Sequence, residues 1–174
     1  MSIRCLTVVL DDDGREVCVF MRTPDGHLTG YGAHLRAFLR GYVIAHIPAA
    51  SDDDKKVPSI GWLAALMIAE FIVGFGAIEL LPSGTRGVGE AYIYFISPRR
   101  KTTATLSSLL NLRIEDIHAD DPPRRSTDEP STTVIYDGLL DEFDPRAVEA
   151  EWSHPRGQDK TNITPEAAKA ANAG

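Results

Sequence analysis

The amino-acid sequence predicts an α+β fold, in which an antiparallel sheet of about five or six strands is covered by two helices. Three observations predict it. Two apolar runs near the start are joined by an Asp-Gly turn, two later segments have helical apolar character, and residues 91–97 alternate as strands do. The 174 residues, 43% of them hydrophobic, are one typical domain's worth. We expect a single domain over residues 1–152 with a flexible linker at about 119–131, and a disordered acidic and polar tail over residues 153–174.

Residues 3–10 and 16–22 are predicted to form a β-hairpin. The tetrapeptide Asp11-Asp12-Asp13-Gly14 joins them, and an Asp-Gly turn accepts the positive φ that a tight hairpin loop needs. Both runs are apolar on both faces. We therefore expect this hairpin to be central in the sheet and covered on both sides.

Two helices are expected in the first half of the chain. The first begins near Tyr31, and its apolar residues recur at i, i+3, i+4 and i+7, while Arg36 and Arg40 lie on its other side. The second runs for about fifteen residues after Ser59, a suitable N-cap, until the glycines at 74 and 76 stop it. This second helix is apolar almost all round, which predicts that it is buried or lies in a dimer interface.

The sequence of the second half of the chain predicts strands at 77–81 and 91–97 around a glycine-rich loop, 82–90. Residues 103–117 are ambiguous, because threonines favour a strand whereas leucines at helical spacing favour a helix. A short strand is expected at 132–136, ended by Asp137-Gly138. The pair Asp144-Pro145 can open a final short helix, 145–152.

The charge pattern limits the classes of partner. The chain carries 18 basic and 25 acidic residues, a net charge of −7, and residues 101–174 hold 14 of the acidic and 8 of the basic groups. The first hundred residues are nearly neutral and can still bind an anion. A general nucleic-acid binder needs a basic face, and no such excess is present. We therefore expect no direct contact with nucleic acid.

Cysteine, histidine and hydropathy patterns predict no cofactor, no metal site and no membrane span. One pair of cysteines is no disulfide framework, and the five histidines show no ligand spacing. The apolar stretch 60–81 carries Glu70 near its centre, which is costly at mid-bilayer. The start has no signal-peptide pattern, so we expect a reducing cytoplasm.

Residues 82–94 form the most informative candidate site. Three glycines within six residues let backbone N–H groups converge on a ligand, and an arginine at the tip supplies a bidentate donor for phosphate or carboxylate. Two tyrosines follow on one face of the next strand and could stack on a ring. The alternative is a glycine-rich hairpin loop followed by a core tyrosine pair. The candidate ligand-binding residues are Gly84, Thr85, Arg86, Gly87, Gly89, Tyr92 and Tyr94.

A second candidate site runs from the end of the second strand into the first helix. Its arginine ends a strand, and its two glycines lie at a helix N-terminus, a natural anion site. The alternative is a strand-to-helix connection that needs glycine. The candidate residues are Arg22, Asp25, Gly30, Tyr31 and Gly32. We expect His27 and His34 to be satisfied or surface histidines, and Glu70 to bond to a nearby helix or a second copy.

Several motifs in a fixed order resemble a family of small, largely uncharacterised proteins of bacteria, archaea and their viruses. The resemblance covers residues 1–143, although Thr23 and Pro24 stand where that family usually has Gln and an aromatic residue. The layout is also similar to that of phage sponge proteins, which sequester cyclic ADP-ribose-type immune signals. The motifs are Met21-Arg22, Asp25-Gly26, Gly-x-Gly-x-x-Leu-x-x-Phe-Leu from Gly30, Leu63-Ala64-Ala65, Pro82-Ser83-Gly84-Thr85, Tyr92-Ile93-Tyr94 and Tyr136-Asp137-Gly138.

These observations favour non-catalytic binding and sequestration of a small anionic, nucleotide-derived ligand. The resemblance implies a phage-encoded counter-defence protein in the cytoplasm of a bacterium or of a phage-infected cell. One alternative is an acidic protein–protein inhibitor or accessory factor that contacts a host protein through the C-terminal third. A weaker one is a phosphodiester hydrolase that uses His27 or His34. We also expect a homo-oligomer, because the second helix would expose apolar surface on a monomer.

Overall fold

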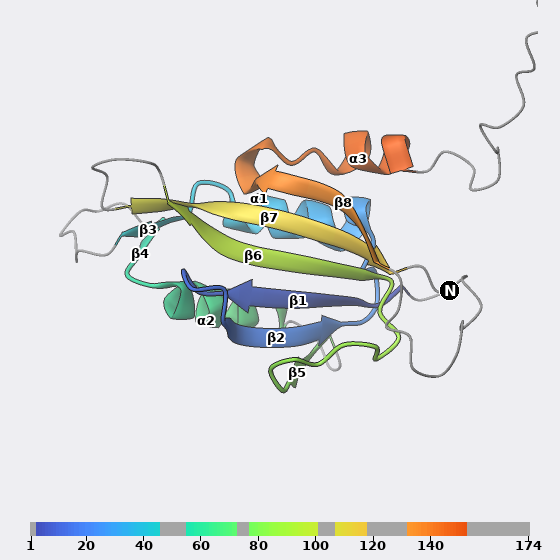
Figure 1. Ribbon diagram of the computed structural model, residues 1–174, viewed down its shortest axis with the longest axis horizontal. Helices are drawn as coiled ribbons and strands as arrows, with labels where there is room; N and C mark the ends of the chain where they lie inside the picture. Colours follow the sequence, from blue (N-terminus) through green and yellow to red (C-terminus); the bar gives the residue numbers. More distant parts are fainter. Residues whose placement is uncertain (1–2, 46–54, 73–76, 101–106, 118–131, 153–174) are drawn as a thin grey trace, which may run out of the picture.

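The computed structural model describes residues 3–45, 55–72, 77–100, 107–117 and 132–152, which form one mixed α/β domain built on a curled sheet (Figure 1). The strands are arranged in the order β4-β3-β7-β6-β1-β2-β5, and β8 also pairs with β7. The strands are β1 (Cys5–Leu10), β2 (Glu16–Arg22), β3 (Val43–Ala45), β4 (Lys56–Val57), β5 (Ile78–Leu81), β6 (Tyr92–Arg100), β7 (Ser107–Ile117) and β8 (Thr132–Leu139).

The sheet is larger than predicted and is not purely antiparallel. It has eight strands, and β1 pairs antiparallel with β2 but parallel with β6. The cause is the segment 82–91. Its turn residues suggested a hairpin, but β5 pairs with the far side of β2, so the chain must cross back over the sheet before β6 begins (Figure 1). The predicted central position of the first hairpin is confirmed, since β1 and β2 each have a neighbour on both sides.

The helical elements are η1 (Leu28–Gly32, a π-helical turn), α1 (Ala33–Leu39), α2 (Ile60–Phe71), η2 (Leu140–Glu142, a 3-10 turn) and α3 (Pro145–Trp152). Ser59 caps α2 as predicted, with its hydroxyl 3.3 Å from the Trp62 N–H. Asp144 likewise opens α3, and its carboxylate accepts the backbone N–H groups of Arg146 and Ala147. The predicted glycine stop of α2, at residues 74 and 76, lies outside the described residues.

Two predictions about the later strands have different outcomes. The ambiguous segment 103–117 is the strand β7 from Ser107 onward. The prediction that Asp137-Gly138 ends its strand is wrong, because β8 continues to Leu139. Gly138 serves packing there, since an added Cβ would lie 3.0 Å from the Tyr136 hydroxyl, which donates to the Leu139 carbonyl. The predicted linker 119–131 and tail 153–174 lie outside the described residues.

The main core lies between the inner face of the sheet and the helices. The Tyr31 and Tyr94 rings meet edge to face there, with centroids 5.3 Å apart, and the Tyr31 hydroxyl lies 2.7 Å from the Thr7 hydroxyl. The side chains of α1 and α2 that are buried in this core are Leu35, Leu39, Ile60, Leu63, Ala64, Met67 and Phe71. The periodicity of the first helix therefore predicted its buried face, whereas the second helix was predicted to be apolar almost all round and has Trp62 exposed.

A smaller core lies on the outer face of the sheet. Leu6, Val8 and Ile93 are buried there, and Val88 of the crossing segment packs against them. The expectation that the first hairpin is covered on both sides is thus confirmed, with the helices on one face and the segment 82–90 on the other. Among the described helices, none has both the length and the apolar character that crossing a membrane requires.

Candidate functional site

The glycine-rich segment 82–90 receives an anion, and that anion is a carboxylate of the chain itself. Glu16, at the start of β2, accepts the Ser83 hydroxyl at 3.0 Å and the Gly84 N–H at 2.5 Å. The Arg86 guanidinium lies 2.6 Å from its other oxygen. Partial burial raises the pKa of Glu16, but these three donors together bring the pKa below its ordinary value. The donors predicted to hold a ligand phosphate are therefore engaged.

A second carboxylate fills the other half of this loop. Glu90 is 5% exposed and accepts the N–H groups of Gly87 at 2.8 Å and Val88 at 2.7 Å. The Thr85 hydroxyl donates to the Pro82 carbonyl. Gly84, Gly87 and Gly89 all have positive φ, so the glycines are needed for the backbone path.

The two tyrosines that follow belong mainly to the protein interior. Tyr94 is fully buried, and its hydroxyl donates to the Gly26 carbonyl at 3.1 Å. Burial raises the pKa of Tyr94 well above its ordinary value. Tyr92 is half-buried against the same core. In this structure Tyr94 has no exposed ring face for a ligand, because β6 lies between β1 and β7 and the inner face is covered by helices.

The second candidate site is also occupied internally. The Gly30 N–H donates to Nδ1 of His27 at 2.9 Å, and the Tyr31 N–H donates to the Asp25 carbonyl at 3.0 Å. His27 Nε2 lies 2.7 Å from the Asp25 carboxylate. An added Cβ on Gly30 would meet that carboxylate at 2.8 Å, so this glycine makes room for Asp25. The N–H groups of this turn are therefore already bonded within the loop.

Arg22 sits between aromatic rings at the end of β2. Its guanidinium lies 5.1 Å from the Tyr31 ring centroid and 5.7 Å from that of Phe71. Its Nε is buried without a hydrogen bond. Tyr31 and Phe71 belong to the inner core, whereas the segment 82–90 lies on the outer face. The structure therefore divides the first candidate site, because its loop lies on the outer face of the sheet whereas Tyr92 and Tyr94 share the inner core with Tyr31 of the second site.

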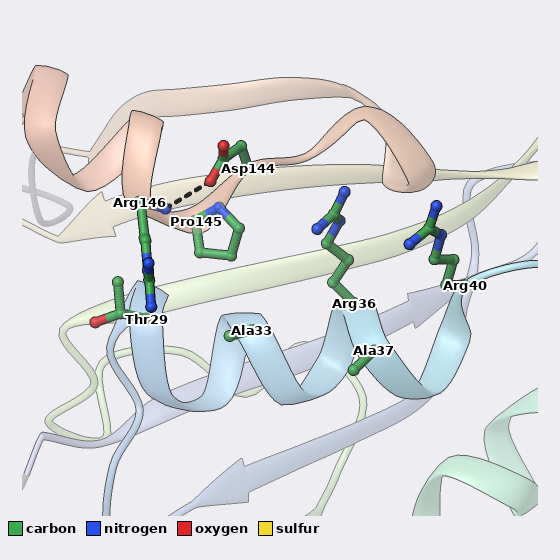
Figure 2. Close-up of a pocket in the computed structure, with 8 residues that line it drawn as sticks. All are labelled: Thr29, Ala33, Arg36, Ala37, Arg40, Asp144, Pro145 and Arg146. Carbon is green, nitrogen blue, oxygen red and sulfur yellow. Dashed lines mark hydrogen bonds between the residues drawn. The ribbon is translucent and has the colours of Figure 1, made fainter.

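A third region, which the sequence did not assign, forms a groove of about 320 Å³ between α1 and α3. Arg36 rises from α1 and Arg40 from its C-cap, and Arg146 reaches down from the first turn of α3 (Figure 2). Their arrangement leaves a strip of short side chains between them. The lining residues are Thr29, Ala33, Arg36, Ala37, Arg40, Asp144, Pro145 and Arg146.

The charges of this groove are not balanced within it. Three arginines line it against one carboxylate, Asp144, which is engaged as the cap of α3. Arg36 donates to the Asp141 carbonyl at 3.3 Å, and its Nε is buried without a hydrogen bond. Within the described ranges, none of the three guanidinium groups forms an ion pair. The arrangement presents unused guanidinium donors to a bound anion.

The elements around the groove hold its two walls together. The Thr29 hydroxyl donates to Glu149 of α3 at 3.2 Å, which ties η1 to α3. The Gly41 N–H donates to the Asp141 carboxylate at 3.3 Å, and the Lys55 ammonium donates to the Arg40 carbonyl at 3.0 Å. These bonds hold η1 against α3 and the end of α1 against Asp141 and Lys55. The guanidinium groups therefore project from anchored backbone.

One further ion pair links the two longer helices of the first half of the chain. His34 Nε2 on α1 lies 3.1 Å from the Glu70 carboxylate on α2, so the expectation that Glu70 bonds to a nearby helix is confirmed. Across the part of the chain that the structure describes, no group of three or more His, Cys, Asp or Glu side chains is placed to hold a metal ion.

Comparison of this chain with protein-family models, with curated proteins and with solved structures finds no match.

Proposed function

We propose that the protein binds a small phosphate-bearing molecule in the groove between α1 and α3 and holds it without turnover. The observation that carries this proposal is the convergence of Arg36, Arg40 and Arg146 on one groove without a carboxylate paired to any of them among the described residues. Nucleotide-derived molecules are the ligand class that the sequence favours. The groove replaces the two glycine segments as the proposed site, because their donors are bonded within the chain.

The chemistry of the groove suits a phosphate. A guanidinium offers two parallel N–H donors that match two phosphate oxygens, and it keeps its charge at any physiological pH. A volume of about 320 Å³ is at the lower end of ordinary small-molecule sites. Guanidinium planes can also stack on a base, which a groove lined by arginines and alanines leaves room for.

The polar groups beside the groove support binding rather than catalysis. The Thr29 hydroxyl donates to Glu149 and points away from Arg36 and Arg40 (Figure 2). The Nδ1 lone pair of His27, which a general base would use, accepts the Gly30 N–H. A hydrolase that uses His27 would first have to break the capping bond of η1. This arrangement fits a protein that sequesters its ligand.

The test is calorimetric titration of the full chain with ADP as the probe at low salt. We expect binding, and a loss of at least about tenfold in affinity for the double variant Arg36→Ala/Arg40→Ala, because two charge-assisted contacts are removed. The variant Ala37→Leu should also block binding, since it fills the floor of the groove while keeping every charge.

The matched control is the double variant Arg15→Ala/Arg99→Ala, which removes the same charge from two exposed positions outside the groove. Its affinity should equal that of the unmodified chain. Equal losses in both double variants would mean that ADP responds to overall charge, and absence of binding to the unmodified chain would overturn the proposal.

The expected homo-oligomer stays a prediction. Trp62 on α2 is 62% exposed, and it is the side chain that an interface on this helix would cover. Light scattering of the variant Trp62→Glu, compared with the unmodified chain, decides it. A mass that falls to that of a monomer supports the interface, and an unchanged mass excludes α2 from it.

A further inference from the structure

Resting on the proposed function, we infer that the ligand carries two separated anionic groups, one held by Arg36 and Arg40 and the other by Arg146. The groove would then take a bisphosphate, such as a nucleoside carrying phosphates on two different positions, in preference to a monophosphate. The inference follows from the positions of the three arginines and from what lies between them.

The arginines form two sets on different elements. Arg36 lies on α1 and Arg40 is the C-cap residue that follows its end, and the two side chains emerge on the same side of the helix (Figure 2). Arg146 comes from the first turn of α3, and its guanidinium lies beside Thr29, at the opposite end of the groove (Figure 2). Thr29 and Arg36 are seven residues apart along η1 and α1, which is about 10 Å of helix. One phosphate cannot accept hydrogen bonds of ordinary length from both ends at once.

The elements that carry the two sets are tied to their neighbours. Arg36 is fixed by its bond to the Asp141 carbonyl. The Asp141 carboxylate also accepts the Gly41 N–H just after the end of α1. Arg146 is carried by a helix that is tied to η1 through the Thr29–Glu149 bond and to β7 through the bond from the Trp152 indole to Asp116. These bonds keep the backbone of the two sets at opposite ends of the groove.

The middle of the groove carries no charge. Ala33 and Ala37 form its floor, and Pro145 lies on the opposite wall (Figure 2). The one carboxylate of the lining, Asp144, points away from α1 and accepts two N–H groups at the start of α3. A neutral spacer such as a sugar fits such a strip, with an anionic group on each side of it.

The test compares adenosine 5′-monophosphate with adenosine 3′,5′-bisphosphate by calorimetry on three full-length proteins. These are the unmodified chain, Arg146→Ala, and Arg36→Ala/Arg40→Ala. We expect the bisphosphate to bind at least about tenfold more tightly than the monophosphate to the unmodified chain. Both variants should weaken the bisphosphate, whereas the monophosphate should respond to the variant at one end only.

Each other outcome overturns the inference in a recognisable way. A monophosphate that is weakened by both variants would mean that one anion contacts all three arginines, which leaves the proposed function intact. Equal affinity of the two probes for the unmodified chain would also exclude a second anion subsite. Binding of neither probe would remove the proposed function itself. Arg146→Lys is a further variant, which keeps the charge at this position. Thermal unfolding of every variant verifies that the fold is retained.

Discussion

The glycine-rich segment 82–90 and the groove between α1 and α3 both present arginine to an anion, but among the described residues only the segment is neutralised by carboxylates. In the segment, Glu16 and Glu90 accept the N–H groups and the guanidinium. In the groove, three arginines face one carboxylate that is engaged elsewhere. The same donor types therefore serve stability in one region and remain available for a ligand in the other.

The strongest way to break this comparison is to remove the internal anion. Glu16→Ala should destabilise the protein by about 2 kcal/mol, because Arg86, Ser83 and the Gly84 N–H lose a charged acceptor that is largely shielded from water. Urea denaturation measures the effect. Glu79→Ala, which removes an exposed carboxylate from β5, is the matched control and should change stability by less than about 0.5 kcal/mol.

An equal effect of the two substitutions would contradict the structural role of Glu16. It would mean that the carboxylate contributes no more than an exposed side chain, and the segment 82–90 would again be a candidate ligand site.

The emptied loop should then accept an external anion. Phosphate at millimolar concentration should raise the unfolding temperature of Glu16→Ala more than that of the unmodified chain, because it would replace the missing carboxylate on the same donors. The difference should be equivalent to about 1 kcal/mol. Chloride at the same ionic strength is the control. An equal response of both proteins to phosphate would show that these donors do not form an anion site.

Periodicity predicted much of the fold, because local spacing decides which face of an element is buried. It gave the hairpin β1–β2, the stripe of α1 and the alternation of β6. It also indicated the strand at 77–81, where β5 lies, but it did not predict that β5 pairs with β2, because a crossing segment and a hairpin loop use the same turn residues. Leu81 pairs with Val19 in the antiparallel register of β5 and β2. The chain that continues from Leu81 then places Gly84 beside Glu16.

The candidate site was less predictable for the same physical reason. The glycines at 84, 87 and 89 correctly indicated unusual backbone and converging N–H groups, yet the identity of the anion depends on a residue about 70 positions away. Arg36 and Arg40 were visible as a pair on the polar side of a predicted helix. Arg146 lines the same groove only because of how α3 packs, and no local sequence pattern predicts that packing. The resemblance to a known family stays a prediction.

A pH series tests the electrostatics of Glu16 on a smaller scale. Its pKa in the folded protein lies below the ordinary value of 4.5, so its contribution to stability is fully present above that value and is lost as the pH falls through the folded pKa. The stability advantage of the unmodified chain over Glu16→Gln should therefore shrink between about pH 5 and pH 2. A constant difference across this range would show that the Glu16 charge has no part in holding the segment.

The smallest expected change in stability sharpens the comparison most, because removing an arginine should stabilise the protein in one region and destabilise it in the other. Arg146 stands in the first turn of α3, where the helix dipole disfavours a cation, and it faces two further arginines across the groove. Arg146→Ala should therefore stabilise the ligand-free protein by about 0.3 kcal/mol at low salt, and the gain should disappear at high salt as the charges are screened. Arg86→Ala should instead destabilise it, since Glu16 loses its ion pair.

Urea denaturation of both variants at two salt concentrations measures the signs of the two changes in stability. A loss of stability in both would mean that the arginines of the groove are structural, as Arg86 is, and that the groove has no donors to spare for a ligand.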